Sequence, residues 1–221
     1  MTSSALKVEC LSKEIDNKYL VKNLSFEIPV GQKVLLLGHN GAGKSTLLKI
    51  FAGLMRASEG SVSIPSNSIA FQGHQLALYD DLSLAENLSF FLSINVSNLN
   101  QIIKTWGLDD CKDRALNSCS QGEKYRTALA CTLAQDPALC LLDEPSTALD
   151  AETLSVLTQN ISSAVGKTFL IASHDFTSFA PSCDRLLILK AGSLVHDSLL
   201  DSISEADRGQ HVNDIYLEYR A

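Results

Sequence analysis

Residues 38–45 read Gly-His-Asn-Gly-Ala-Gly-Lys-Ser, and this stretch decides the fold of the 221-residue chain. It matches the pattern GxxxxGK[ST] and lies between an apolar run, Lys33–Leu37, and a segment of helical character over about 44–54. That strand-loop-helix context is the one a phosphate-binding loop requires. Backbone N–H groups and the helix dipole would both face the anion. We expect nucleotide phosphates to be bound by Gly38, His39, Asn40, Gly41, Ala42, Gly43, Lys44, Ser45 and Thr46.

Two side chains of this loop carry the chemistry that its backbone cannot supply. Lys44 is placed to bridge the β- and γ-phosphates, and the Ser45 hydroxyl is placed to hold Mg²⁺. The alternative is a plain glycine turn without a ligand. The surrounding strand and helix favour the nucleotide interpretation, so ATP and Mg²⁺ are the expected cofactors.

A pair of acidic residues ends a second apolar run. Residues 138–142 are apolar and lead directly into Asp143 and Glu144. In phosphoryl transfer the protein mainly positions groups and neutralises charge. Asp143 is therefore predicted to contact Mg²⁺ through water, and Glu144 to polarise the attacking water. An acidic cap at a strand end is the alternative interpretation.

His174 follows a third apolar run, Thr168–Ala172. Ligands of α/β sheets bind beyond the carboxyl ends of the strands. A lone histidine is more often a surface or core residue, but this position predicts a role for His174 at the γ-phosphate.

Alternation of short apolar runs and helical segments predicts an α/β fold with a mostly parallel sheet. An N-terminal antiparallel hairpin turns at Asp16-Asn17, a closing hairpin turns at Gly192, and the tail from about 198 is expected to be helical and polar. We expect a single domain, 1–221, with a nucleotide-binding core (1–75 and 137–221) and an inserted helical subdomain (76–136). The expected strands are 6–10, 19–28, 33–37, 61–64, 68–71, 139–142, 168–172, 186–189 and 193–196; the expected helical segments are 44–54, 84–134 and 151–164.

Composition narrows the class of protein. The net charge is −7, which argues against a general nucleic-acid binder. The apolar runs are too short to span a bilayer and no signal peptide is recognisable, so a cytosolic location is expected. Six cysteines without a CxxC pair fit a reducing compartment, with Cys131 and Cys140 as small buried hydrophobic residues.

In this order the motifs resemble those of the ABC ATPase family, from about residue 7 to 197. GHNGAGKST resembles its phosphate loop, and LCLLDEP resembles its second nucleotide motif. Residues 146–150, Ser-Thr-Ala-Leu-Asp, resemble its D-loop and imply a nucleotide role for Asp150; residues 173–175 resemble its switch histidine. The resemblance implies a P-loop NTPase core.

The glutamine that links Mg²⁺ and water to a transport partner in this family has two candidates. The register leaves Gln72 open, but the following LALYDDLSLAENLSFF fits Gln75 better. The resemblance therefore implies a metal and catalytic role for Gln75.

The signature segment, defined here as residues 119–123, reads Cys-Ser-Gln-Gly-Glu where the family has LSGGQ. The resemblance implies that Ser120, Gly122 and the following helix N-terminus bind the γ-phosphate held by a second copy of the chain, in a head-to-tail homodimer. Glu123 adds negative charge near that anion. An ordinary serine helix cap is the alternative.

The adenine platform departs from the family pattern. An aromatic residue is usual where Ile15 stands, and Tyr19 is near in sequence but at a different spacing. We therefore expect Ile15 to contact the base, with Tyr19 as the alternative.

The resemblance implies an ATP-hydrolysing subunit, peripheral on the cytoplasmic face of a membrane through a polytopic permease. Gly73-His74-Gln75 and Glu86-Asn87-Leu88 resemble the ATPase of the haem-handling cytochrome c maturation exporter. A groove over residues 75–91, with Leu76, Leu78 and Tyr79 beside Asp80 and Asp81, is expected to receive a permease helix. The alternatives are a soluble ABC ATPase of a cytosolic assembly machine, such as metallocluster biogenesis, and a nucleotide-binding regulator.

Overall fold

A computed structural model describes residues 3–92 and 96–219 of the chain. It contains a three-stranded antiparallel sheet of order β2-β1-β4 and a six-stranded sheet of order β5-β6-β7-β3-β8-β9. The strands are β1 (Ser4–Ile15), β2 (Lys18–Pro29), β3 (Lys33–Leu37), β4 (Glu59–Ser63), β5 (Ile69–Gln72), β6 (Leu139–Asp143), β7 (Thr168–Ala172), β8 (Arg185–Lys190) and β9 (Ser193–Leu199).

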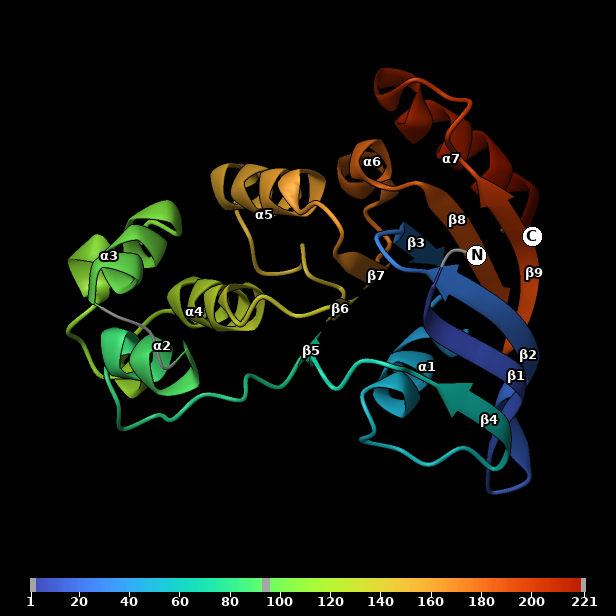
Figure 1. Ribbon diagram of the computed structural model, residues 1–221, viewed down its shortest axis with the longest axis horizontal. Helices are drawn as coiled ribbons and strands as arrows, with labels where there is room; N and C mark the ends of the chain where they lie inside the picture. Colours follow the sequence, from blue (N-terminus) through green and yellow to red (C-terminus); the bar gives the residue numbers. More distant parts are fainter. Residues whose placement is uncertain (1–2, 93–95, 220–221) are drawn as a thin grey trace.

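The helices fall into two groups (Figure 1). Between β5 and β6 the chain forms α2, α3 and α4, which lie together at one end of the molecule, whereas the antiparallel sheet lies at the other end. The α-helices are α1 (Lys44–Phe51), α2 (Leu84–Leu92), α3 (Val96–Thr105), α4 (Gln121–Ala134), α5 (Ala151–Ser163), α6 (Phe176–Phe179) and α7 (Glu205–Tyr219); short 3-10 turns are η1 (Asp109–Cys111), η2 (Leu116–Ser118) and η3 (Ala180–Ser182).

Most of the large sheet is parallel, as the sequence predicts. β5, β6, β7, β3 and β8 run parallel to their neighbours, and only β9 is antiparallel, paired with β8. Parallel strands covered on both faces are apolar throughout, and every residue of β6 and β7 is buried. The carboxyl ends of β3, β6 and β7 therefore meet at one edge, where the phosphate loop and residues 143–144 and 174 follow.

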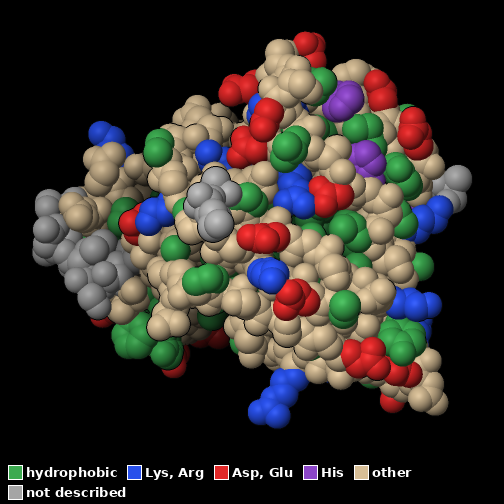
Figure 2. Space-filling model, turned by 45° about the vertical axis from the view of Figure 1, so that its right-hand side comes forward, with side chains coloured by type: hydrophobic (Ala, Val, Ile, Leu, Met, Phe, Trp, Pro, Cys, Tyr) green, Lys and Arg blue, Asp and Glu red, His purple; other side chains and the backbone are tan. Residues whose placement is uncertain are grey.

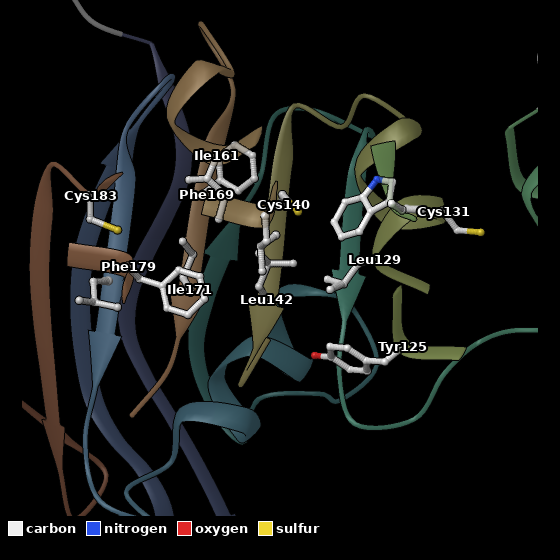
Figure 3. Packing of buried hydrophobic residues seen from close by; sticks show 14 of the residues in the cluster. Tyr125, Leu129, Cys131, Cys140, Leu142, Ile161, Phe169, Ile171, Phe179 and Cys183 are labelled. Atoms are coloured by element: carbon white, nitrogen blue, oxygen red, sulfur yellow. The ribbon is translucent and has the colours of Figure 1, made fainter. Parts of the chain in front are cut away.

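Alternate residues of each central strand enter two different cores. Leu35 and Leu37 of β3 belong to the core under α4, α5 and α7, whereas Val34 and Leu36 belong to the core shared with α1 and the antiparallel sheet. This is the period-two alternation of a strand between two layers. Figure 3 follows the first core, with Cys140 and Leu142 on β6, Phe169 and Ile171 on β7, and Tyr125 and Leu129 on α4.

Several predicted element boundaries shift. The helix after the phosphate loop ends at Phe51 rather than near residue 54, because Gly53 adopts a φ of 72° and its N–H turns back to the Ile50 carbonyl. The tail is not wholly helical: β9 continues to Leu199, and α7 begins at Glu205. Nor is its helix polar all round, because Val212 is buried and Tyr216 and Tyr219 pack against the core.

The surface and the thiols follow the composition. On the face in Figure 2, acidic and basic side chains are interspersed. Cys131 and Cys140 are buried, which confirms their prediction as core residues, and burial raises the pKa of both thiols to about 12. Across the described part of the chain, no helix combines the length and apolarity that a membrane crossing needs.

Candidate nucleotide site

A cavity of about 1030 Å³ opens at the carboxyl edge of the central sheet. Every residue of the phosphate loop lines it, from Gly38 to Thr46, and so do Glu144 and His174. The remaining lining residues are Leu20, His74, Thr147, Phe176 and Tyr216. Three motifs that are far apart in the sequence thus face one space.

Glycine is required at two positions of the loop by both conformation and space. Gly38 and Gly43 have φ values of 153° and 108°. A Cβ at Gly38 would collide with the Leu189 carbonyl, and one at Gly43 with the Leu20 carbonyl. Other residues would therefore cost both backbone strain and a steric clash, and the close turn leads directly into α1.

Lys44 lies at the start of α1 with only 6% of its side chain exposed. Its Nζ donates to the Gly38 carbonyl at 2.7 Å and lies 3.5 Å from Glu144 Oε1. A buried ammonium requires such partners. The cation is thus held between the first residue of the loop and the acidic end of β6.

Ser45 and Asp143 form a second pair beneath the loop. The Ser45 hydroxyl donates to Asp143 Oδ1 at 3.0 Å, and Asp143 is 1% exposed. Among the described residues nothing hydrogen-bonds the buried Oδ2 of Asp143. A buried carboxylate oxygen without a donor suits a hydrated divalent cation, because Mg²⁺ prefers oxygen ligands and retains several waters. The pair therefore fits Mg²⁺.

Glu144 and His174 are in direct contact. Glu144 Oε2 lies 2.6 Å from His174 Nδ1 and accepts the His174 backbone N–H at 3.1 Å. Glu144 has a φ of 53°, a left-handed conformation that is uncommon outside glycine. Its N–H donates to the Ala172 carbonyl at 2.7 Å, and its carbonyl accepts from the Thr147 hydroxyl at 3.0 Å. These bonds hold the strained residue so that its carboxylate faces the cavity.

The two candidate glutamines lie in different environments. Gln72 is buried, its amide donates to the Gly73 carbonyl at 2.8 Å, and its carbonyl oxygen accepts from Thr132 at 3.1 Å. Gln75 is exposed on the loop after β5, and its neighbour His74 lines the cavity. Gln72 is therefore part of the buried interior, whereas Gln75 is accessible but outside the cavity lining.

The hairpin contributes a residue other than the one expected. Ile15 is 42% exposed at the end of β1, and Tyr19 is 41% exposed. Neither lines the cavity, whereas Leu20 does. Contact of Ile15 with adenine stays a prediction.

Sequence reasoning missed residues that reach the site from other elements. Phe176 of α6 and Tyr216 of α7 line the cavity; the Tyr216 ring lies 6.0 Å from that of His39 and 5.9 Å from that of Phe176, centroid to centroid. Tyr125 of α4 places its hydroxyl 3.5 Å from the Glu144 carbonyl, and burial beside Asp143 and Glu144 raises its pKa to about 12. No local motif signals Tyr216, because α7 is brought to the loop only by tertiary packing.

The signature segment and Asp150 lie outside this cavity. Ser120 and Gly122 are not among its lining residues. Ser120 caps α4, and Asp150 caps α5 by accepting the Thr153 N–H at 2.8 Å, a bond that lowers the pKa of Asp150. The helix-cap interpretation of Ser120 therefore describes its local structure.

A glycine-rich loop with a buried lysine, a serine-aspartate pair and a glutamate-histidine pair define a P-loop nucleotide-binding protein. The family model described as ABC transporter matches residues 21–147, more than half of the chain. The chain belongs to the ABC transporter family, as an ATP-binding subunit with ATP hydrolase activity.

Individual relatives cover most of the chain. It is 28% identical over 95% of its length to the ABC transporter ATP-binding protein NatA of Bacillus subtilis, 95% of which is covered. It is 33% identical over 91% of its length to the petrobactin import ATP-binding protein FpuC of Bacillus anthracis, 84% of which is covered. Among solved structures, the ATP-binding cassette MJ0796, a dimer bound to ADP and Pi in a post-hydrolysis state, superposes with a TM-score of 0.77 at 26% identity, over 88% of this chain and 98% of that one.

Proposed function

We propose that this subunit hydrolyses Mg-ATP at an interface between two copies of itself and drives a membrane transporter. The observation that carries the proposal is the division of its motifs. Lys44, Asp143 and Glu144 lie together, whereas Ser120 and Gly122 lie outside that cavity. The signature segment would thus serve a nucleotide other than the chain's own, as the dimeric relative bound to ADP and Pi supports.

In this proposal each group in or near the cavity has one task. The loop N–H groups and Lys44 bind and neutralise the β- and γ-phosphates. Ser45, Asp143 and Gln75 would hold Mg²⁺, which supplies charge neutralisation when bound. Glu144 orients the attacking water, and His174, which contacts the Glu144 carboxylate, fixes that carboxylate and reaches the γ-phosphate.

ATP would join two copies head to tail. Ser120 and Gly122 of each copy face the γ-phosphate of the other, and the D-loop with Asp150 lies at the same interface. Such an arrangement is isologous and closes as a C₂ dimer. Residues 76–136 form the subdomain that presents the signature, and residues 1–75 and 137–221 form the core that holds ATP.

A surface for the membrane partner lies on the helical end. Tyr79, Phe90 and Phe91 form an aromatic patch, with the Tyr79 ring 4.9 Å from that of Phe90, and Tyr79 and Phe90 are 49% and 59% exposed. Leu76, Leu78 and Phe91 are partly buried and pack against the core. Exposed Asp80 and Asp81 flank it. These features suit an amphipathic cytosolic helix of a permease with basic flanks, which would hold the subunit at the cytoplasmic face of the membrane.

Haem handling in cytochrome c maturation is the cargo class that the Gly73-His74-Gln75 and Glu86-Asn87-Leu88 segments support. Asn87 is buried and binds the Tyr79 backbone through its amide oxygen and amide nitrogen, at 2.8 and 3.0 Å. It therefore shapes the loop that carries the aromatic patch. The second candidate, a cytosolic metallocluster machine, would use the same nucleotide chemistry with a soluble partner.

The test combines turnover with partner capture. We expect Mg-dependent ATP hydrolysis, its loss in Glu144→Gln, and an ATP-dependent dimer of that variant in size-exclusion chromatography, because glutamine keeps the shape but activates water poorly. Crosslinking from Tyr79→Cys in solubilised membranes should capture a cytosolic loop of a polytopic protein. Crosslinks only to soluble proteins would favour the assembly machine, and a Glu144→Gln protein that stays monomeric with ATP would contradict the shared site.

A further inference from the structure

The signature segment ends in an acidic residue whose charge is fully engaged within the chain. Glu123 Oε2 accepts the Ser120 backbone N–H at 2.7 Å, and the Ser120 hydroxyl oxygen accepts the Glu123 N–H at 3.2 Å. This reciprocal pair is a capping box at the N-terminus of α4. The other carboxylate oxygen of Glu123, Oε1, binds Arg114 Nη2 at 2.5 Å.

This arrangement leaves one proton of Ser120 available. The Ser120 N–H and one lone pair of its hydroxyl are used inside the box, so its O–H can still donate to a phosphate oxygen. The Glu123 carboxylate is only 17% exposed and is shared between the Ser120 N–H and Arg114. Its negative charge is therefore balanced by Arg114 rather than directed at an incoming γ-phosphate.

Arg114 is itself held by the chain that leads to the aromatic patch. The backbone N–H of Arg114 donates to the Cys111 carbonyl at 3.0 Å, and the backbone carbonyl of Arg114 accepts the Leu84 N–H at 3.2 Å. The neighbouring Asn117 N–H donates to the Asp80 carbonyl at 3.0 Å. The segment that carries Arg114 is thus tied to the loop preceding α2, so one guanidinium connects that loop with the start of the signature helix.

We propose that Arg114 is a positioning residue for ATP hydrolysis: it neutralises Glu123 and fixes the capping box, so that Ser120 and Gly122 meet the γ-phosphate held by the second copy. This inference rests on the proposed role of the signature segment. Without Arg114, the Glu123 carboxylate would face that phosphate with its charge uncompensated, and like charges oppose each other across a closing interface. Arg114 itself need not touch the nucleotide.

A double-mutant cycle in the full chain tests the pairing. Arg114→Met should lower ATP turnover about tenfold, in line with loss of a hydrogen bond between charged groups, and weaken the ATP-dependent dimer of a Glu144→Gln background. Binding of ATP to the isolated monomer should not change, because the cavity is intact. In a Glu123→Gln background the same change should cost less than about twofold, because glutamine keeps the capping box without a charge to balance.

The control is Lys167→Met, which removes a surface ion pair with Asp136 of 2.8 Å and should leave turnover unchanged. Circular dichroism and thermal midpoints identify a variant that does not fold. If Arg114→Met does not fold, Arg114→Lys, which keeps the positive charge, tests the inference instead and should retain most ATP turnover. Equal losses from Arg114→Met in the parent chain and in the Glu123→Gln background would overturn the inference. A Ser120→Ala variant with full turnover would instead refute the signature role in the proposed function, whatever Arg114 does.

Discussion

The phosphate end and the signature end of this molecule are built in opposite ways. At the phosphate end, Lys44 and Glu144 come from distant segments and line one cavity, and Asp143 lies beneath the loop against Ser45. At the signature end, Ser120 and Glu123 are neighbours whose polar groups bind each other and Arg114. The first is a site that tertiary folding assembles within one chain. The second is a local motif, outside that cavity, that we propose acts on another chain.

Removing the phosphate-end cation should have the largest effect. Lys44 bonds the Gly38 carbonyl and lies beside Glu144, and it is the lysine of the phosphate loop. We expect Lys44→Ala to lower ATP turnover at least about a hundredfold, in line with the loss of other groups that stabilise transition-state charge. Steady-state phosphate release and equilibrium nucleotide binding would measure this. Near-normal turnover would mean that the cavity is not the hydrolytic site.

Mixing variants tests whether the two ends act on different chains. Lys44→Ala and Ser120→Ala should each be almost inactive alone. About half of the dimers in an equal mixture would be mixed, and each would keep one intact site, so about a quarter of the parental turnover should return. A mixture of Lys44→Ala and Glu144→Gln, which are both altered at the phosphate end, is the matched control and should stay inactive. If neither mixture recovered ATP turnover, the two ends would not act on different chains of the dimer.

Sequence predicted the phosphate end better than the rest because its motifs are tied to strand ends. The runs 33–37 and 168–172 are predicted as strands with the bounds observed, and the parallel sheet then forces residues 38–46, 143–144 and 174 to one edge. Local sequence patterns predicted the strands, and the parallel arrangement of those strands placed the motif residues together.

Contacts between distant segments could not be read in this way. Tyr216 reaches His39 only because α7 folds back over the site, and Gln72 is withdrawn from it by Thr132 of α4. The negative charge of Glu123 looked unfavourable from sequence, since its partner Arg114 lies on a separate turn whose direction no periodicity specifies. Side-chain partners across elements, rather than the elements themselves, are what the sequence left open.

Base selection should show a smaller effect at the phosphate end. Neither Ile15 nor Tyr19 lines the cavity, and Leu20, the hairpin residue that does, has no π-face or polar group. GTP turnover should therefore lie within about tenfold of ATP turnover, or about 1.4 kcal/mol. If adenine lies against Ile15, as the sequence predicts, Ile15→Tyr should tighten ATP binding, because stacking of a base on an aromatic ring contributes about 1–3 kcal/mol. Titration with both nucleotides measures this; an ATP preference that disappears in Tyr19→Ala would assign the platform to Tyr19.

The smallest expected effect is on folding stability in acid, which the two ends should lose in different pH ranges. In β9, on the nucleotide-binding core, burial lowers the pKa of His196, opposed by Asp197 and Glu218 and aided by His211. Its unfolded pKa is near 6.5, so the unfolded chain binds the proton first, and stability is lost as pH falls below about 6.5.

In the signature segment, the hydrogen bond from the Ser120 N–H lowers the pKa of Glu123 below 4.5. Its contribution is complete above about 4.5 and is lost only as the pH falls further. Thermal midpoints between about pH 7.5 and 3.5 should therefore decline in two stages. His196→Gln should flatten the first stage, and Glu123→Gln should reduce the second. If His196→Gln left the decline below about pH 6.5 unchanged, His196 would not be the group whose protonation destabilises the core in mild acid.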